Sequence, residues 1–409
     1  MDKKINNLQY YKFSLYGFLK NLRFFDAFLI LFLLDKGLTY TQIGGLYAIR
    51  EVFINVFEVP SGIIADTFGR KNSLIGSLSV YILSFLIFHW ASSYALFLIA
   101  FILYGIGDAF RSGTHKGMIM DYLRINQWEK FKINYYGHTR SWSQIGSALS
   151  SLMAGILIFL SGQYGNIFLY SIVPYLINLL LIISYPKELN FSPQKKKVKF
   201  NLTQTLKTLG LVVKQRTVID VVSTSAIHSA YLKAVKDYIQ PLMAHIAIAL
   251  PVLIGVSQEK KSGLIIGIIY FFVYIFTSQA SKMASLFTTP DKRRIALVTL
   301  LIGFLLGAFT GLMYHYEWWW VSLISFVGIY LIENLRKPIL TGFVAEEVPP
   351  EILTSVISVQ SLLKTIITAL LAFVFGILAD KLGIGLSFII LSLFLAISSL
   401  LLSYLLRAK

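Results

Sequence analysis

The chain has 409 residues, of which 56% are hydrophobic and only 14% are charged. A soluble domain is about 25% charged, so this composition, with a mean hydropathy of +0.69, excludes a water-soluble globular protein. The net charge of +17 does not indicate a nucleic-acid-binding protein, because the basic residues are spread among apolar runs, and the absence of cysteine excludes disulfides and thiolate metal sites.

Apolar runs of about twenty residues recur along the whole chain, and each is long enough to cross a hydrocarbon core of about 30 Å as a helix. Helices are expected because backbone amides cannot stay unpaired in lipid, and because barrel strands would alternate in polarity over about ten residues. The sequence therefore predicts an all-α membrane protein with twelve transmembrane helices, at 13–35, 42–65, 72–90, 95–120, 138–161, 166–185, 217–245, 262–287, 294–315, 318–344, 353–379 and 384–406.

Basic residues concentrate in alternate loops, with eight Lys or Arg between Lys187 and Arg216. Because such loops stay in the cytoplasm, we expect both termini to be cytoplasmic and the protein to be multi-pass in the plasma membrane. The cationic stretch 1–11 leads into an apolar run without a small-residue cleavage site. The first span is therefore expected to be retained.

The longest polar interruption follows the sixth span. It predicts two six-helix bundles, residues 1–185 and 217–409, joined by a basic cytoplasmic loop at 186–216. The apolar segment 241–257 either extends the seventh span or lies at the outer interface. A shift of 225 residues aligns acid, base, glycine and acid in order, and so indicates duplicated halves: it places Asp108, Arg111, Gly117 and Asp121 on Glu333, Arg336, Gly342 and Glu346.

The loop between the second and third spans carries the clearest motif, Gly62-Ile-Ile-Ala-Asp66-Thr-Phe-Gly69-Arg70-Lys71. Gly62 allows close helix approach and Gly69 a tight turn, while Asp66 can accept from a helix N-terminus and the two basic residues can bind acids and headgroups. This G-x-x-x-D-x-x-G-R-K pattern resembles the signature loop of the major facilitator superfamily. The matching loop of the second half, 289–294, lacks both glycines.

The resemblance implies a secondary transporter in which two bundles rock about a central cavity. It also implies a cytoplasmic latch that holds when the cavity faces outward. In this sequence the latch would consist of Asp66, Arg70 and Asp121, with Glu346 and Arg293 or Arg294 in the corresponding place of the second half. The expected partners are a small-molecule substrate, membrane lipids and protons, and the expected state is a monomer.

Ionisable side chains occur inside many predicted spans, and such charges are candidates for a substrate or proton pathway because burying them in lipid is costly. Tyr104, Asp108, Arg111 and His115 share one helical stripe of the fourth span. The structural alternative is internal ion pairing that holds helices together. The candidate set is Arg23, Asp26, Arg50, Glu51, Asp108, Arg111, His115, Lys116, Arg140, His228, Lys233, Asp237, Glu333 and Arg336.

Bases outnumber acids among the intramembrane charges, which favours an anionic or zwitterionic substrate. Three acids and two histidines could carry protons, so a proton-coupled transporter is expected, with a facilitator that uses no ion as the alternative: Asp26, Asp108, Glu333, His115 and His228. The stretch from Phe110 to Asp121 is similar to a pattern of small bacterial exporters of drug or unknown substrates, with Lys116 where that group tends to carry glutamate. A multidrug/proton antiporter is therefore the alternative.

Other classes lack their sequence signals. There is no G-x-x-x-x-G-K-S/T loop for ATP, no H-E-x-x-H and no D-D-x-x-D cluster. No enzymatic activity, cofactor or metal is therefore expected. A polytopic lipid-modifying enzyme and a non-transporting sensor on the same fold stay as less favoured alternatives.

Overall fold

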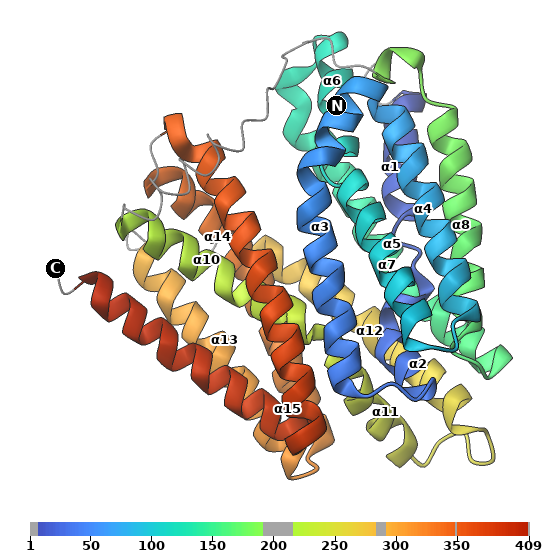
Figure 1. Cartoon of the computed structure of the whole chain (residues 1–409), viewed down its shortest axis with the longest axis vertical. Helices are drawn as coiled ribbons and strands as arrows, with labels where there is room; N and C mark the ends of the chain where they lie inside the picture. The colour runs from blue at the N-terminus through green and yellow to red at the C-terminus, as the bar shows by residue number, and fades with distance from the viewer. Residues whose placement is uncertain (1–6, 191–215, 284–291, 348–349, 408–409) are drawn as a thin grey trace. The chain divides into compact units, whose positions relative to one another are not determined.

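The computed structural model describes residues 7–190, 216–283, 292–347 and 350–407, and every regular element within these ranges is a helix (Figure 1). Seven segments of the described chain are both long and apolar enough to cross a membrane by length and composition. The predicted all-α membrane class is thereby confirmed. Residues 191–215, the larger part of the predicted loop 186–216, lie outside the described residues.

Seven of the predicted spans form one long helix each, as their continuous apolar character predicts. Their bounds extend the predicted ranges by a few residues at half of the ends: α3 (Tyr40–Phe68), α4 (Arg70–Trp90), α7 (Lys132–Ser161), α8 (Asn166–Ile183), α12 (Gln258–Met283), α13 (Lys292–His315) and α14 (Trp319–Glu347). The last two spans run together as α15 (Pro350–Arg407), which is divided by Gly383 at φ 81°.

Three other spans are broken inside the region predicted to be helical. The first consists of α1 (Leu8–Leu19), the 3-10 turn η1 (Phe24–Ala27) and α2 (Leu29–Asp35). The fourth divides into α5 (Tyr94–Arg111) and α6 (Thr114–Ile125) at Gly113, whose φ of 74° interrupts the helix. Non-helical backbone at membrane depth is tolerated where protein or water satisfies it.

The seventh span is the third broken one. It consists of α10 (Arg216–Val235), the 3-10 turn η4 (Lys236–Tyr238) and α11 (Ile239–Ala249). The segment 241–257, left open by the sequence, is helical as far as Ala249 and continues without helix to the start of α12. The seventh span is therefore extended by only about two turns beyond Pro241.

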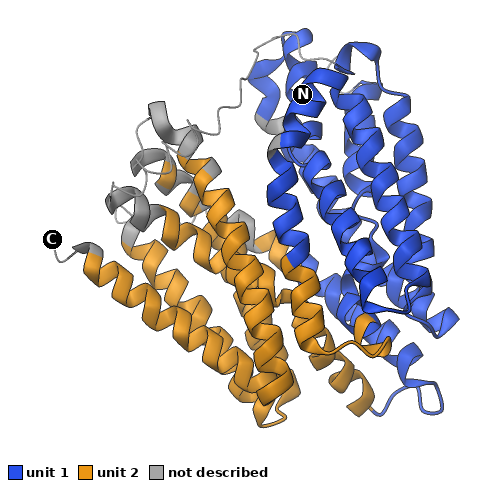
Figure 2. Ribbon diagram, in the orientation of Figure 1, with its two compact units in different colours: residues 1–32, 49–199, 251–274 blue, residues 33–48, 200–250, 275–409 orange. Residues whose placement is uncertain are grey.

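The chain forms two compact units (Figure 2). Unit 1 comprises 1–32, 49–199 and 251–274, and unit 2 comprises 33–48, 200–250 and 275–409. Each unit thus takes one segment from the opposite half of the sequence. Most of the predicted linker lies outside the described residues, so the boundary at 186–216 stays a prediction.

The exchanged segments pack on glycine. In unit 1, a Cβ on Gly155 of α7 would lie 2.7 Å from the carbonyl oxygen of Gly263 in α12. In unit 2, a Cβ on Gly44 of α3 would lie 2.5 Å from the carbonyl oxygen of Ala372 in α15. Lipid gives no hydrophobic drive between helices, so such small residues hold them together by close backbone packing.

Candidate functional site

The break in the first span of unit 1 places a charged pair inside the bundle. α1 ends at Leu19, and η1 carries Asp26 in its first turn. The Arg23 guanidinium lies 2.7 Å from the Asp26 carboxylate and also donates to the hydroxyl of Tyr104 on α5. Both charged side chains stay about a quarter exposed, at 27% and 26%, so water or a ligand can reach them.

A second charged pair lies at the end of α5. Arg111 donates from Nη2 to the Asp108 carboxylate at 2.7 Å, and from Nε to the hydroxyl of Tyr81 at 3.0 Å. Tyr81, on α4, itself donates to the same Asp108 oxygen. One tyrosine hydroxyl thus joins both charges, and this closed arrangement makes their burial tolerable.

Buried tyrosines connect the two pairs. The Tyr81 ring meets those of Tyr104 and Tyr175 edge-on, at centroid distances of 5.1 and 5.4 Å. Tyr175, on α8, donates to the backbone carbonyl of Lys20 at 3.0 Å. Tyr104 was among the residues predicted from the sequence, but Tyr81, Tyr175 and Lys20 were not, because no motif marks them.

The other unit 1 candidates differ in surroundings. Arg50 lies 3.1 Å from the buried Glu51, and its guanidinium faces the Tyr104 ring at 5.9 Å. His115 belongs to α6, beyond the break at Gly113, and stacks on Tyr16 at 3.7 Å, so the predicted continuous stripe of the fourth span is wrong at this point.

Two basic candidates remain in unit 1. The Lys116 ammonium lies over the Tyr136 ring at 5.2 Å. Arg140, on α7, is exposed, and within the described part of the chain its guanidinium has no hydrogen-bond or ion-pair partner. A free guanidinium on a membrane-spanning helix is available to bind an anion.

The signature loop lies wholly in unit 1, between α3 and α4. Arg70 is paired with Asp121 of α6, and its Nε lies 3.8 Å from Asp66. The three residues predicted to form a latch are thus neighbours. Gly117 of α6 makes room for them, since a Cβ there would lie 2.5 Å from the Arg70 guanidinium.

Asn190 completes this loop and was not found from the sequence. Its side-chain oxygen accepts from the backbone N–H of Lys71 at 3.1 Å, at the start of α4. Gly69, at φ 98°, passes so close to Asn190 that a side chain there would collide with it. Lys71 turns away and donates from Nζ to the carbonyls of Ile183 and Tyr185.

Unit 2 contains a buried acid–histidine pair. His228 of α10 lies with Nδ1 2.7 Å from the Glu333 carboxylate of α14, and Ser229 donates to the other carboxylate oxygen. The His228 Nε2 is buried and has no hydrogen-bond partner among the described residues. An unpaired buried N–H is costly, so we assign the proton to Nδ1, with neutral His228 donating to ionised Glu333.

Arg336 follows Glu333 at the spacing of Arg111 after Asp108, but it does not form an ion pair with that acid. Its guanidinium is fully buried and donates to the carbonyls of Ala296 and Thr224 and to the hydroxyl of Thr299. These contacts join α10, α13 and α14. The fixed fork of guanidinium donors suits a residue that bonds to three acceptors at once.

Of the remaining unit 2 candidates, two lie toward the end of the seventh span and one lies on α14. Asp237 of η4 is 3.4 Å from the Lys236 ammonium and accepts from the hydroxyl of Tyr47 at 3.0 Å. Lys233 is partly buried on α10. Glu346 belongs to the last turn of α14, and its side chain lies outside what the structure describes.

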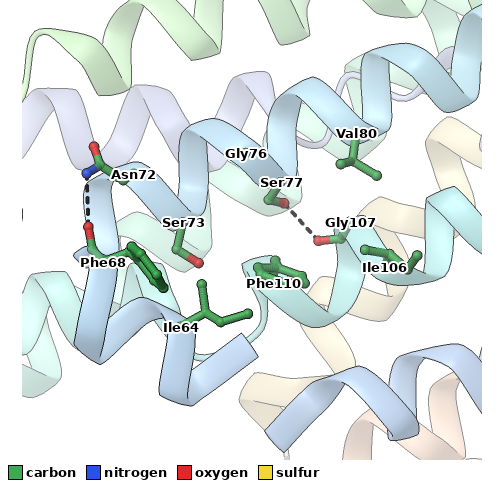
Figure 3. A pocket seen from close by; sticks show the side chains of 10 residues that line it. All are labelled: Ile64, Phe68, Asn72, Ser73, Gly76, Ser77, Val80, Ile106, Gly107 and Phe110. Carbon is green, nitrogen blue, oxygen red and sulfur yellow. Dashed lines mark hydrogen bonds between the residues drawn. The ribbon is translucent and has the colours of Figure 1, made fainter. Parts of the chain in front are cut away.

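Within the described residues, no group of three His, Asp or Glu lies close enough to hold a metal ion. A pocket of about 260 Å³ opens beside the signature loop in unit 1, between Phe68, Gly76, Gly107 and Phe110 (Figure 3). Its lining is almost entirely apolar and includes no charged residue. An ionic solute would gain no counter-charge there.

The sequence profile of the Major Facilitator Superfamily matches residues 17–367, which is most of the chain. This chain belongs to the Major Facilitator Superfamily. Its twelve-helix fold and its class as a non-enzymatic transporter follow from this membership. Membership also means that the chain is an integral, multi-pass membrane protein that binds a small molecule.

Relatives and solved structures agree with the superfamily. The chain is 23% identical over 388 residues to the uncharacterized MFS-type transporter YxaM of Bacillus subtilis (strain 168), covering 91% of this chain and 89% of that protein. The nucleoside transporter NupG has a similar structure, with a TM-score of 0.76 at 14% identity, covering 98% and 99% of the two chains.

A D-xylose–proton symporter is also similar in structure, with a TM-score of 0.63 at 15% identity and 94% of both chains covered. Likenesses at such identities show the fold alone. The substrate of this superfamily member must therefore be argued from its own side chains.

Proposed function

We propose that this chain is a secondary active transporter that moves a small anionic or zwitterionic solute by alternating access, coupled to protons. The observation that supports it best is the pair of Arg–Asp clusters in unit 1, Arg23 with Asp26 and Arg111 with Asp108. The first pair lies at the break of the first span and the second at the end of α5, and both remain partly open to solvent.

Charges used only to hold helices together should be sealed from water. Arg336 shows that pattern in this protein, since its side chain is fully buried among carbonyl and hydroxyl acceptors. Arg111 and Asp108, by contrast, keep 26% and 18% of their side chains exposed. A salt bridge that is paired but reachable can exchange its partner for a charged substrate group.

Proton coupling is supported by the two acids with hydroxyl and basic partners, Asp108 and Glu333. Glu333 is buried with His228 and Ser229 as its partners. If Glu333 took up a proton, its buried negative charge would be removed and its hydrogen bond from His228 would be weakened. Such a site has two states that differ in charge, which is what coupling requires.

The signature loop supports alternating access. Arg70 connects α4 to the end of α3 and to α6 through Asp66 and Asp121. Breaking these pairs would free the cytoplasmic ends of three helices. We assign the plasma membrane and cytoplasmic termini to the protein as part of the same proposal, on the basis of its basic loops. A monomeric state belongs to the proposal as well.

A ligand screen followed by transport tests the proposal. Purified protein is heated with carboxylates, phosphates, amino acids, nucleosides and amphipathic drugs, because a ligand that binds the native state raises its thermal stability, and raises it further as the ligand concentration increases. Each stabilising compound is then assayed for uptake into liposomes that contain only this protein. Uptake driven by an imposed pH gradient is expected. Stabilising ligands that never cross the membrane would contradict a transporter, and amphipathic drugs as the sole substrates would favour the drug antiporter.

A further inference from the structure

Lys20 is a cation without a partner in the part of unit 1 that carries the two Arg–Asp clusters. It follows the last residue of α1, where the first span breaks. Its backbone is fixed, because its N–H bonds to the carbonyl of Tyr16 and its own carbonyl accepts from Tyr175. Within the described residues, its ammonium has neither a hydrogen bond nor an ion pair.

The surroundings of Lys20 make this unusual. Tyr175, which bonds to the Lys20 carbonyl, packs against Tyr81, and Tyr81 accepts from Arg111. Gly17, about one turn earlier on α1, packs so closely on α7 that a Cβ there would lie 2.9 Å from the carbonyl oxygen of Thr139, the residue before Arg140.

Arg111, Arg23 and Arg140 all act electrostatically on the Lys20 ammonium. The nearby carboxylate, Asp108, is already bonded to Arg111 and Tyr81. A partly buried ammonium beside three guanidinium groups is repelled by all of them and gains little from an engaged acid.

Neighbouring groups leave a surplus of positive charge here. Asp26 offsets Arg23, and Asp108 offsets Arg111. Lys20 and Arg140 have no offsetting acid in the described part of the chain. Two reachable cations beside a hydrogen-bonded guanidinium match an oxyanion, which accepts several donors at once.

We infer that Lys20, together with Arg140 and the outer edge of the Arg111 guanidinium, forms the site that binds the oxyanion group of the substrate. A carboxylate or a phosphate would supply the counter-charge that the folded chain lacks. Lys20 contributes a compact, mobile charge, and Arg140 contributes a planar donor fork. This inference rests on the proposed transport function and names the substrate class of the same site.

The first test uses stability without ligand. Lys20→Met replaces the lysine by an uncharged side chain of similar length and so removes a charge that the neighbouring guanidinium groups repel. The melting temperature of the purified variant should therefore equal or exceed that of wild type. Lys20→Arg should resemble wild type. Lys132→Met is the matched control, because Lys132 is exposed near the start of the same helix, α7, that carries Arg140. A clearly lower melting temperature for Lys20→Met would show a structural lysine and overturn the inference.

The second test uses inorganic phosphate and succinate as probes, with sodium chloride at matched ionic strength to remove screening effects and dimethyl succinate as the uncharged analogue. At least one oxyanion should stabilise wild type saturably. Its apparent affinity should fall about tenfold or more in Lys20→Met and in Arg140→Met. It should be kept in Lys20→Arg and in Lys132→Met. No stabilisation of wild type by either oxyanion, or equal affinity in Lys20→Met, would overturn the site.

Chemical labelling of wild-type protein avoids the variants altogether. An amine-acylating reagent should modify Lys20. The oxyanion that stabilises wild type in the second test should reduce this modification, whereas dimethyl succinate should not. Equal labelling of Lys20 with and without the oxyanion would contradict the site. Uptake assays separate this inference from the proposed function: unchanged transport by Lys20→Met would refute the site alone, whereas absence of transport by wild type would refute the function.

Discussion

Tyr81 shows how single residues make charge tolerable inside this protein. Its hydroxyl donates to Asp108 and accepts from Arg111, so each charge has a second polar partner besides the other. A buried polar network is stable only when its members are satisfied. The aromatic ring also packs against Tyr104 and Tyr175, which fixes where the two charges can lie.

The sequence predicted which charged residues lie inside the spans but not how they pair. It matched Glu333/Arg336 to Asp108/Arg111 because both have the same spacing. The structure separates them, since Glu333 bonds to His228 and Ser229, and Arg336 bonds to backbone carbonyls. Spacing along one helix does not say which neighbouring helix supplies the nearest acceptor. Lys20, although inside the predicted span 13–35, was missed because no motif or spacing marks it.

Arg336 should therefore behave as a structural residue. Arg336→Lys keeps the charge but cannot reach the acceptors on α10 and α13 together, so it should destabilise the protein by about 2–4 kcal/mol. Arg111→Lys, at a partly exposed position, should lose ligand affinity with a much smaller loss of stability. Thermal unfolding and ligand-induced stabilisation of the two variants measure the contrast. Equal ligand affinity in Arg111→Lys and wild type would contradict the roles assigned.

The spans of this fold were predicted from the sequence, but the breaks inside them were not. The predicted spans matched the long helices closely, because a run of apolar residues is a strong signal. The breaks at 20–23 and 236–238 gave no such signal, since neither contains Gly or Pro. They are held by tertiary contacts, such as Tyr175 to Lys20, that a local pattern cannot reveal.

Asp380 provides a helix cap that joins two parts of unit 2. Its carboxylate accepts from the backbone N–H groups of Tyr40 and Thr41, at 2.8 and 2.7 Å, at the start of α3. The stretch Gly376-Ile-Leu-Ala-Asp380-Lys-Leu-Gly383 repeats the G-x-x-A-D-x-x-G spacing of residues 62–69. Gly376 is required for this approach, because a Cβ there would lie 2.3 Å from the Tyr40 carbonyl oxygen.

Removing this cap should destabilise the start of α3. Asp380→Ala leaves two helix N–H groups without a charged acceptor, and should lower stability by about 1–2 kcal/mol. Asp380→Asn keeps one acceptor oxygen and should lower it less. Asp35→Ala, at the exposed end of α2, is the control and should have little effect. The order of melting temperatures checks the assignment, and an Asp380→Ala protein as stable as the control would refute it.

At the scale of the whole molecule, span count and the signature loop identified the superfamily correctly. The exchange of segments between the compact units was not predictable in the same way. Residues 33–48 and 251–274 join the unit opposite to their place in the sequence, through glycine contacts with α15 and α7. A contact between distant parts of the chain depends on shape, and no local composition marks it.

The cysteine-free sequence makes orientation testable with single cysteines. Ser257 precedes α12, and Lys130 lies in the turn η2 (Glu129–Phe131), and both are exposed. By the alternation of basic loops, Ser257→Cys in intact cells should react with a membrane-impermeant maleimide. Lys130→Cys should react only after the membrane is permeabilised. The reverse pattern would overturn the proposed cytoplasmic termini.

The most direct test of proton-coupled transport compares accumulation with exchange in liposomes that contain wild-type or Asp108→Asn protein. Wild type should accumulate the stabilising ligand against its gradient when a pH difference is imposed, and a protonophore should abolish that accumulation. Asp108→Asn keeps the hydrogen bonds of the site but loses its titratable charge. It should therefore exchange labelled for unlabelled ligand without accumulating it. Accumulation by Asp108→Asn at the wild-type level would contradict the role of Asp108 in coupling. Accumulation by wild type that does not depend on the pH difference would contradict proton-coupled transport.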